Sequence, residues 1–218
     1  MKNENLYVQK INLIQKWINQ GFKNIDVLRT FEQVPRENFV LPEFIDKSYL
    51  DIPLPILSGQ TISQPSTVVF MLDLLNIKPG QKILEIGVGS GYNAAMLATL
   101  VGKSGKVVSA EIIPELYEFA KENLKKTGIE NVELILSDKN TLGYKNDAPY
   151  DRIIVTAGAP EIPEPLIDQL KEGGILLIPV GSLMGQEMIR ITKIDGKLER
   201  ENLGLFNFVP LTGQYGQK

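Results

Sequence analysis

Glycines cluster in one stretch of this sequence, with a spacing that suits binding of a nucleoside ligand. Residues 84–98 read LEIGVGSGYNAAMLA and place Gly87, Gly89 and Gly91 directly after an apolar run. Glycines at such a position let the backbone turn tightly and approach a ligand closely. Tyr92 occupies the position where the dinucleotide pattern G-x-G-x-x-G needs its third glycine. The spacing G-x-G-x-G therefore argues against a dinucleotide.

Acidic residues accompany the loop at the ends of successive predicted strands. Glu85 lies just before the loop and would suit a ligand that carries an amine, since a pyrophosphate needs a helix N-terminus that is open to an anion. Glu111 comes 20 residues after Gly91, where a carboxylate can accept hydrogen bonds from both ribose hydroxyls. Asp138 follows the third strand, in position to reach an adenine. Together these groups predict S-adenosylmethionine, a nucleoside with a cationic amino-acid tail.

The elements that must position these groups are visible as alternating strand and helix patterns. From residue 82 onward, short runs rich in β-branched residues alternate with helical stretches, which indicates parallel strands joined by crossover helices. Most of the runs are almost wholly apolar, as expected for strands covered on both faces. A helix predicted at residues 114–127 begins with proline and stops at Gly128. The predicted strands are residues 82–86, 106–111, 132–136, 152–156 and 175–180.

The two ends of the chain follow other patterns. Apolar residues recur at three- and four-residue intervals between residues 6 and 50, which predicts helices. Residues 187–193 and 197–209 flank Asp195-Gly196, a hairpin turn signal. We therefore expect an α/β fold with a doubly wound, mostly parallel sheet, an antiparallel C-terminal edge and an N-terminal helical preface. The expected organisation is a single domain over residues 1–218, with the preface at 1–58, the cofactor-binding core at 59–181 and the antiparallel edge with the C-terminal segment at 182–218.

Composition narrows both the chemistry and the setting. The 218 residues include no cysteine and no histidine, and the net charge is −3. Without histidine the chain lacks the commonest general base and the commonest metal ligand, so no metal is expected. The negative charge gives no overall attraction to phosphate backbones, and no apolar run is long enough to span a membrane. We therefore expect a cytoplasmic protein without a nucleic-acid or membrane partner.

The loop and its acidic companions resemble the cofactor site of Rossmann-like methyltransferases, and longer stretches narrow the resemblance to the protein-L-isoaspartate O-methyltransferase family. Residues 59–75, GQTISQPSTVVFMLDLL, resemble the segment that precedes the cofactor loop in that family. Residues 149–181 are similar to its fourth and fifth strands almost throughout. The stretches VPRENFV at 34–40 and FVPLTGQYG at 208–216 resemble its helical preface and its ending. The resemblance thus covers nearly the whole chain from about residue 34.

This resemblance implies S-adenosyl-L-methionine as the cofactor and assigns roles to individual residues. The serine of the family's TIS segment is the residue assigned to catalysis, and it corresponds to Ser63. The alternative for this serine is a structural role as a helix N-cap before Gln64 and Pro65. Residues that would line the methyl-transfer site or surround the cofactor are Thr61, Glu85, Gly87, Gly89, Gly91, Glu111, Ile112, Asp138, Lys139 and Thr212.

Two short stretches depart from the family pattern. Residues 63–66 read SQPS where the family usually has SAPH, which removes a histidine from the expected pocket. Residues 137–139 read SDK where the usual sequence is GDG, which places the charge of Lys139 near the expected adenine. Both departures leave the exact substrate open.

The resemblance implies methylation of the free α-carboxylate of L-isoaspartyl residues in damaged proteins, which initiates repair through a succinimide. Such a carboxylate, with a reference pKa of about 3.5, is ionised at neutral pH and needs no general base. Three alternatives remain: a related carboxyl O-methyltransferase acting on a modified peptide or a small molecule, a non-catalytic S-adenosylmethionine-binding module, and a nicotinamide-dependent dehydrogenase.

Overall fold

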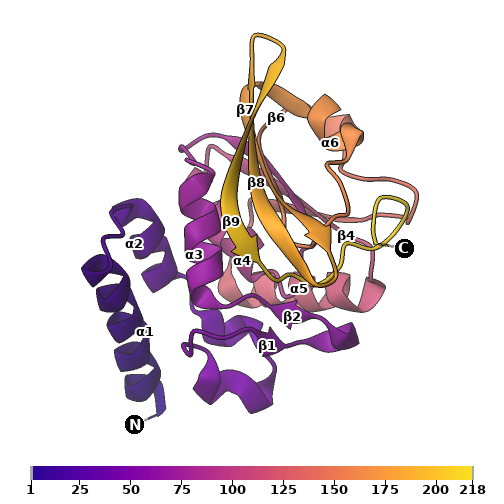
Figure 1. The fold of residues 1–218 in the computed structure, drawn as a ribbon. Coiled ribbons are helices and arrows are strands. Elements are labelled where there is room, and N and C mark those ends of the chain that lie inside the picture. The colour runs from indigo at the N-terminus through magenta and orange to yellow at the C-terminus, as the bar shows by residue number, and fades with distance from the viewer. Residues whose placement is uncertain (1, 218) are drawn as a thin grey trace.

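One central sheet organises the computed structural model, which describes residues 2–217 (Figure 1). Its strands are β3 (Lys82–Ile86), β4 (Lys106–Glu111), β5 (Val132–Leu136), β6 (Tyr150–Val155), β7 (Leu170–Ser182), β8 (Gly185–Ile194) and β9 (Lys197–Phe206). They lie in the order β5-β4-β3-β6-β7-β8-β9. The pairs from β5 to β7 are parallel, and β7–β8 and β8–β9 are antiparallel. The predicted α/β class, with a mostly parallel sheet and an antiparallel C-terminal edge, is confirmed.

The predicted strands match the observed ones with shifts that have structural causes. β3, β4 and β5 coincide with their predicted ranges, whereas β6 begins two residues early, at Tyr150. β7 is much longer than the predicted 175–180, because its start pairs with β6 at Leu170 and its end pairs with β8 as far as the Ser182–Gly185 pair at the turn. Asp195 and Gly196 both have positive φ, 50° and 71°, as a tight two-residue hairpin turn requires. The hairpin signal in the sequence is confirmed.

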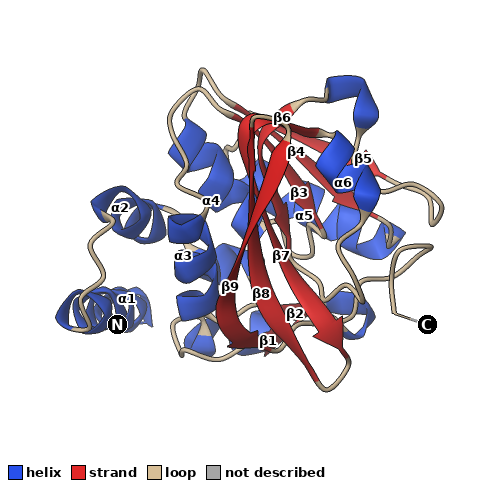
Figure 2. Ribbon diagram, turned by 45° about the horizontal axis from the view of Figure 1, so that its top comes forward, coloured by secondary structure: helices blue, strands red, loops and turns tan. Residues whose placement is uncertain are grey.

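Helices cover the two faces of the sheet unevenly (Figure 2). They are α1 (Lys2–Asn19), α2 (Ile25–Gln33), α3 (Pro65–Leu74), α4 (Tyr92–Val101), α5 (Pro114–Thr127) and α6 (Glu164–Asp168). Because successive strand residues point to opposite faces, Ile83 and Leu84 of β3 belong to different apolar clusters. The cluster of Ile83 includes residues of α1 to α5, and that of Leu84 includes Leu166 of α6 and Leu211. The C-terminal segment therefore helps to cover the second face.

The helical preface ends before residue 58, which corrects the predicted boundary. After α2 come two short 3₁₀ helices at Arg36–Phe39 and Pro42–Lys47, and then strand β1 (Leu54–Pro55). β1 pairs antiparallel with β2 (Thr61–Ile62). Prolines at 53 and 55 explain the change, since each favours an extended conformation in the residue before it. The β1–β2 hairpin brings residues 60–63 toward the carboxyl edge of the large sheet.

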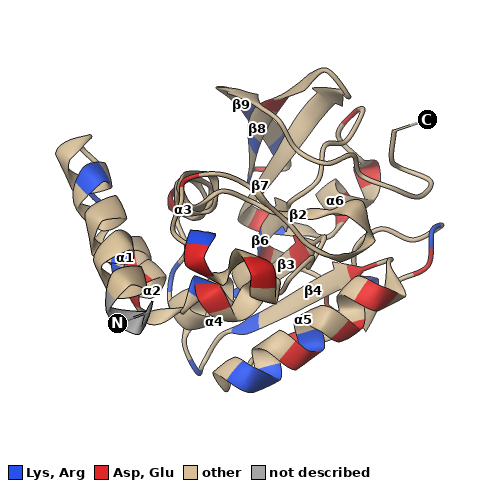
Figure 3. Ribbon diagram, turned by 90° about the horizontal axis from the view of Figure 1, so that it is seen from below, with Lys and Arg blue, Asp and Glu red and all other residues tan. Residues whose placement is uncertain are grey.

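Helix α5 has the ends that the sequence predicts. It begins at Pro114 and ends at Thr127, and Gly128 follows with a φ of 68°, the left-handed conformation common after a helix. Acidic and basic residues are interspersed along α5 (Figure 3), and Glu118 pairs with Lys121 at 3.3 Å. Across residues 2–217, no helix combines the length and the apolar character needed to cross a membrane.

Candidate active site

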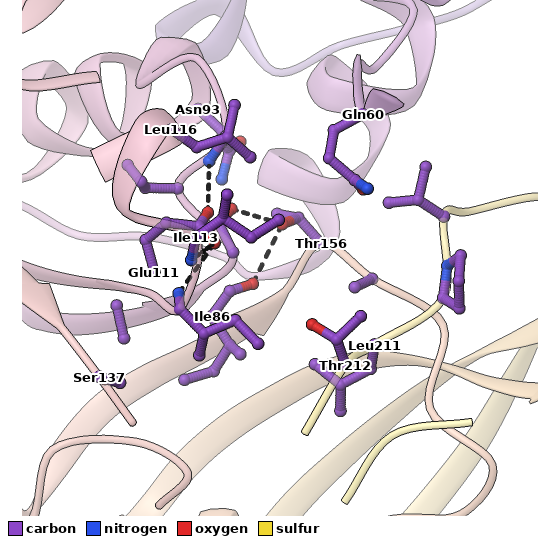
Figure 4. A pocket seen from close by; sticks show the side chains of 18 of the residues that line it. Gln60, Ile86, Asn93, Glu111, Ile113, Leu116, Ser137, Thr156, Leu211 and Thr212 are labelled. Carbon is purple, nitrogen blue, oxygen red and sulfur yellow. Dashed lines mark hydrogen bonds between the residues drawn. The ribbon is translucent and has the colours of Figure 1, made fainter. Parts of the chain in front are cut away.

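A cavity lies at the edge of the sheet where β3, β4 and β6 end (Figure 4). Carboxyl ends of neighbouring parallel strands meet at one edge, and the crevice outside them is the usual ligand position in such sheets. The lining comes from the glycine loop after β3, the residues after β4 and β5, the β2 segment at 60–63 and the segment at 209–215. The fold thus brings together residues that lie far apart in the sequence.

Three left-handed glycines give the loop its shape. The φ angles of Gly87, Gly89 and Gly91 are 91°, 54° and 85°. A Cβ on Gly87 would lie 2.6 Å from the Thr156 hydroxyl oxygen, which no real contact allows. Gly87 and Gly89 line the cavity, whereas Gly91 is packed against the backbone of Ala120 and precedes α4. Two of the predicted glycines therefore face the ligand position, and the third supports the loop from behind.

Glu111 is held at the cavity by backbone amides (Figure 4). Its Oε2 accepts a hydrogen bond from the Gly89 amide at 3.1 Å. Its Oε1 accepts from the amides of Ile112 at 2.8 Å and Ile113 at 3.0 Å. A carboxylate offers about four acceptor positions, so Oε2 keeps room for one further donor. We therefore expect one ribose hydroxyl, rather than both, to bind this group. Ile112 lines the cavity beside it.

Glu85 lies behind the cavity and is not part of its lining. Its side chain is 0% exposed. Oε1 accepts a hydrogen bond from Asn93 Nδ2 at 2.7 Å, and the Ser109 hydroxyl donates to Oε2. Burial raises the pKa of Glu85 to about 7, because the charged form loses its hydration. The residue that meets the cavity from this network is Asn93.

The predicted catalytic serine lines the cavity together with two threonines. Ser63, Thr61 and Thr212 all contribute to the wall. The N-cap of α3 is Gln64, and the amide of Ser66 in its first turn donates to Asp51 Oδ1 at 3.0 Å. Ser63 is therefore not the N-cap of α3, so the alternative structural role is not observed. Within residues 2–217 the Ser63 hydroxyl has no hydrogen-bond partner, so it is available to a ligand.

Asp138 and Lys139 occupy different places, although they are neighbours. Asp138 is exposed, lies outside the lining, and its Oδ1 accepts from the amides of Asn140 at 2.6 Å and Thr141 at 3.1 Å. It therefore shapes its own turn. Lys139 lines the cavity, and its carbonyl accepts from the Gln214 amide at 2.8 Å. This bond ties the C-terminal segment to the loop after β5.

Sequence reasoning missed two polar residues of the lining, Thr156 and Asn93. The Thr156 hydroxyl lies 3.0 Å from the carbonyl oxygen of Ile86 and 2.6 Å from that of Gly87 (Figure 4). Its position at the end of a predicted parallel strand was the available signal, because ligand-contacting residues gather there. Asn93 carried no comparable signal, since its role depends on the buried carboxylate beside it.

The donors and acceptors at this cavity fit a nucleoside with a zwitterionic tail. An anchored carboxylate suits ribose, the N-terminus of α4 suits a carboxylate, and apolar residues such as Leu116 and Leu142 offer walls for a base. Among residues 2–217, no group of three or more Asp, Glu, His or Cys side chains could hold a metal ion.

Comparison with known proteins decides the family. A family model described as protein-L-isoaspartate(D-aspartate) O-methyltransferase matches residues 8–216. The protein-L-isoaspartate O-methyltransferase of Methanopyrus kandleri is 50% identical over 206 residues, covering 94% of this chain and 91% of that protein. The chain belongs to this family. The Pyrococcus horikoshii enzyme is 46% identical over 219 residues, covering 99% of this chain and 98% of its own length.

Solved structures agree with this family assignment. A protein-L-isoaspartate O-methyltransferase structure matches with a TM-score of 0.84 and 32% identity, covering 99% of this chain and 67% of that one. A Plasmodium falciparum protein assigned to the same family, solved in complex with S-adenosyl-L-homocysteine, matches with a TM-score of 0.79 and 30% identity over 91% of this chain and 95% of its own. This methyltransferase therefore uses S-adenosylmethionine as its cofactor.

The two departures from the family pattern affect the methyltransferase site differently. Ser66 stands where the family usually has histidine, but it lies outside the lining and its hydroxyl bonds Asp51. In this chain the position therefore supports the start of α3 and is not part of the cavity wall. Lys139 is part of the wall, so the second departure changes a residue of the cavity.

Proposed function

We propose that this chain transfers a methyl group from S-adenosylmethionine to the free α-carboxylate of L-isoaspartyl residues, with Ser63 as the catalytic residue. The observation that supports this most directly is that Ser63 and the anchored Glu111 line the same cavity, in a chain whose family match spans residues 8–216. Ser63 would orient the methyl acceptor, and Glu111 would hold the methyl donor. The methyl ester is a better electrophile for closure to a succinimide, which can hydrolyse to normal aspartyl.

The chemistry requires positioning and exclusion of water rather than a general base. S-Adenosylmethionine supplies an activated sulfonium methyl group when bound. The acceptor carboxylate, with a pKa of about 3.5, is already ionised near neutral pH. Glu111 would hold the ribose, and the Ser63 hydroxyl would donate a hydrogen bond that orients the carboxylate. This mechanism is consistent with a chain that has no histidine.

The segment at 209–212 is the best candidate for contacting the substrate backbone. Its Val209 carbonyl accepts from the Gly158 amide at 2.8 Å, and its Leu211 amide donates to the Gly158 carbonyl at 2.9 Å. In an extended segment alternate residues point their peptide groups to opposite sides, so those of Thr212 face away from Gly158. The Thr212 peptide group could pair with an extended peptide at the cavity.

A direct assay tests the proposed reaction. We expect incubation with S-adenosylmethionine to add one methyl group to an isoaspartyl peptide and none to the same peptide with normal aspartate, as read by mass spectrometry. Methylation of both peptides, or of neither, would contradict the proposal. Methylation of a small carboxylic acid in place of the peptide would favour the second candidate, a related carboxyl methyltransferase, which the departure from the family pattern at Lys139 in the wall supports.

Substitution of Ser63 separates its catalytic role from cofactor binding. Ser63→Ala is expected to lower kcat about five- to thirtyfold, since one hydrogen bond to a charged group is worth roughly 1 to 2 kcal/mol at a partly open site. The affinity for S-adenosylhomocysteine, measured by calorimetry, should change less than about threefold, because the hydroxyl acts on the acceptor. Equal losses of affinity and turnover would place Ser63 at the cofactor instead. Ser66→Ala, outside the lining, is the control for the same chemical change nearby.

A further inference from the structure

Glu85, Asn93 and Ser109 form a buried polar chain directly behind the cavity wall. Glu85 on β3 is 0% exposed, as is Ser109 on the neighbouring strand β4. The Ser109 hydroxyl donates to one carboxylate oxygen, and Asn93 Nδ2 donates to the other at 2.7 Å. Asn93 belongs to the first turn of α4 and lines the cavity. Both oxygens of Glu85 are therefore engaged within the protein.

The chemistry of the partners determines which way the Asn93 amide points. A carboxylate only accepts hydrogen bonds, and an asparagine has one donor end and one acceptor end. In its ionised form, which prevails above its pKa of about 7, Glu85 accepts from the Nδ2 end of Asn93 and leaves the Oδ1 end for the cavity. No residue in the described range 2–217 donates a hydrogen bond to this oxygen. The cavity thus presents an acceptor whose orientation is set by a buried charge.

An acceptor in this place suits the ammonium group of the cofactor tail. An ammonium group only donates hydrogen bonds, so it needs an acceptor. The N-terminus of the ten-residue helix α4, where Asn93 lies, favours a negative charge and suits the carboxylate of the cofactor tail. The Glu85 carboxylate is one hydrogen bond away, in a buried setting where charges interact strongly. Glu85 is thus too deeply buried to contact an amine itself, but its charge can act through Asn93.

We propose that Glu85 is a positioning residue that orients Asn93 so that its amide oxygen accepts a hydrogen bond from the ammonium group of S-adenosylmethionine. This inference rests on the use of this cofactor in the proposed function. It changes the role predicted for Glu85 from a direct ligand to a residue that acts through its neighbour. It also makes Asn93 a residue that recognises the amino end of the tail.

Two ligands that differ only in the amine test the proposal. S-Adenosylhomocysteine carries the ammonium, and its desamino analogue keeps the carboxylate and lacks the ammonium. Glu85→Gln removes the charge and the acceptor-only constraint, so the glutamine nitrogen can donate to Asn93 Oδ1 and turn the Asn93 nitrogen toward the cavity. By calorimetry we expect S-adenosylhomocysteine to bind at least about tenfold more weakly, and the desamino analogue to change less than about threefold, since only the first loses a charge-assisted bond. Asn93→Ala should give the same pattern.

An exchange of the two side chains gives a sharper test. Combining Glu85→Gln with Asn93→Asp restores an acceptor toward the cavity and keeps one carboxylate in the pair. This double variant is expected to recover S-adenosylhomocysteine affinity to within about threefold of the unmodified chain, whereas a merely structural role for Glu85 predicts no recovery. Should Glu85→Gln alone fail to fold, Asn93→Ala and the double variant still test the idea.

Asn131→Ala is the matched control, because Asn131 Nδ2 binds the carbonyls of Ala98 and Gly102, each at 3.0 Å, at the opposite end of α4. It should lower stability without changing the affinity for either ligand. Equal losses for both ligands, unchanged binding of S-adenosylhomocysteine by Glu85→Gln, or no recovery in the double variant would overturn the proposal. These binding measurements need no peptide, so failure of the isoaspartyl assay would overturn the proposed substrate and leave this inference standing.

Discussion

Glu111→Ala is expected to weaken S-adenosylhomocysteine binding more than about tenfold, since a hydrogen bond to a charged group in an enclosed site is worth roughly 1.5 to 3 kcal/mol. The hydrogen bonds of Glu111 within the protein give a second reason for this loss of affinity. Glu111 also accepts from the amides of Gly89, Ile112 and Ile113, so its removal frees the glycine loop and the residues after β4 together. The ligand then loses both a direct partner and the shape of the loop that surrounds it.

Calorimetry with S-adenosylhomocysteine measures this effect, with circular dichroism to show that the variant is folded. Glu118→Ala is the control, because this substitution removes the same charge. Glu118 lies on the adjoining helix α5 in an exposed pair with Lys121. Its effect should be small, since surface pairs contribute about 0 to 1 kcal/mol. Unchanged affinity in a folded Glu111→Ala variant would remove this residue from the cofactor site.

Gly87→Ala is expected to lower the melting temperature by about 5 to 15 °C, from backbone strain and steric overlap of roughly 2 to 5 kcal/mol in total. The φ of Gly87 is 91°, a conformation that side-chain-bearing residues rarely adopt, and the added Cβ would lie 2.6 Å from the Thr156 hydroxyl oxygen. To relieve this overlap, either the loop moves or the Thr156 hydroxyl rotates away from the carbonyl oxygens of Ile86 and Gly87, which it now contacts. Cofactor binding should be lost with the shape of the loop.

Thermal unfolding followed by circular dichroism measures the change, and two further variants divide it into its causes. Gly128→Ala has a positive φ of 68°, in the left-handed region, but no atom within 4 Å of its added Cβ, so it carries the backbone strain alone. It should cost about 1 to 2 kcal/mol. Adding Thr156→Ala to Gly87→Ala removes the overlap and should recover part of the stability. Equal losses in Gly87→Ala and Gly128→Ala would show that the contact with Thr156 is unimportant.

Local sequence patterns were sufficient for the elements that form the centre of the fold. β3, β4 and β5 have their predicted bounds because each is a short apolar run between clear breaks. The helix at 114–127 was equally clear, since proline begins it and glycine follows it. The lengths of β7 and β1 could not be predicted in this way. The length of β7 depends on pairing with β6 and β8, and that of β1 on pairing with β2.

For the site, the sequence by itself determined which strand ends face the ligand. Parallel strands of known order place their carboxyl ends at one edge, so the glycine loop and Glu111 line the cavity as the spacing predicts. The same logic selected Glu85 and Asp138, which are just as close in sequence to that edge. It could not say which carboxylates face inward.

Only the tertiary structure decided which polar groups line the cavity and which are used by the protein itself. Glu85 points into the interior and bonds Ser109 and Asn93, whereas Asp138 caps the turn that follows it. Thr156 comes into the wall because β6 lies beside β3, a neighbour distant in the chain. The physical reason is that a hydrogen bond depends on direction and distance in space. Spacing along a chain determines the strand end at which a side chain stands, but the packing around that end determines its partner.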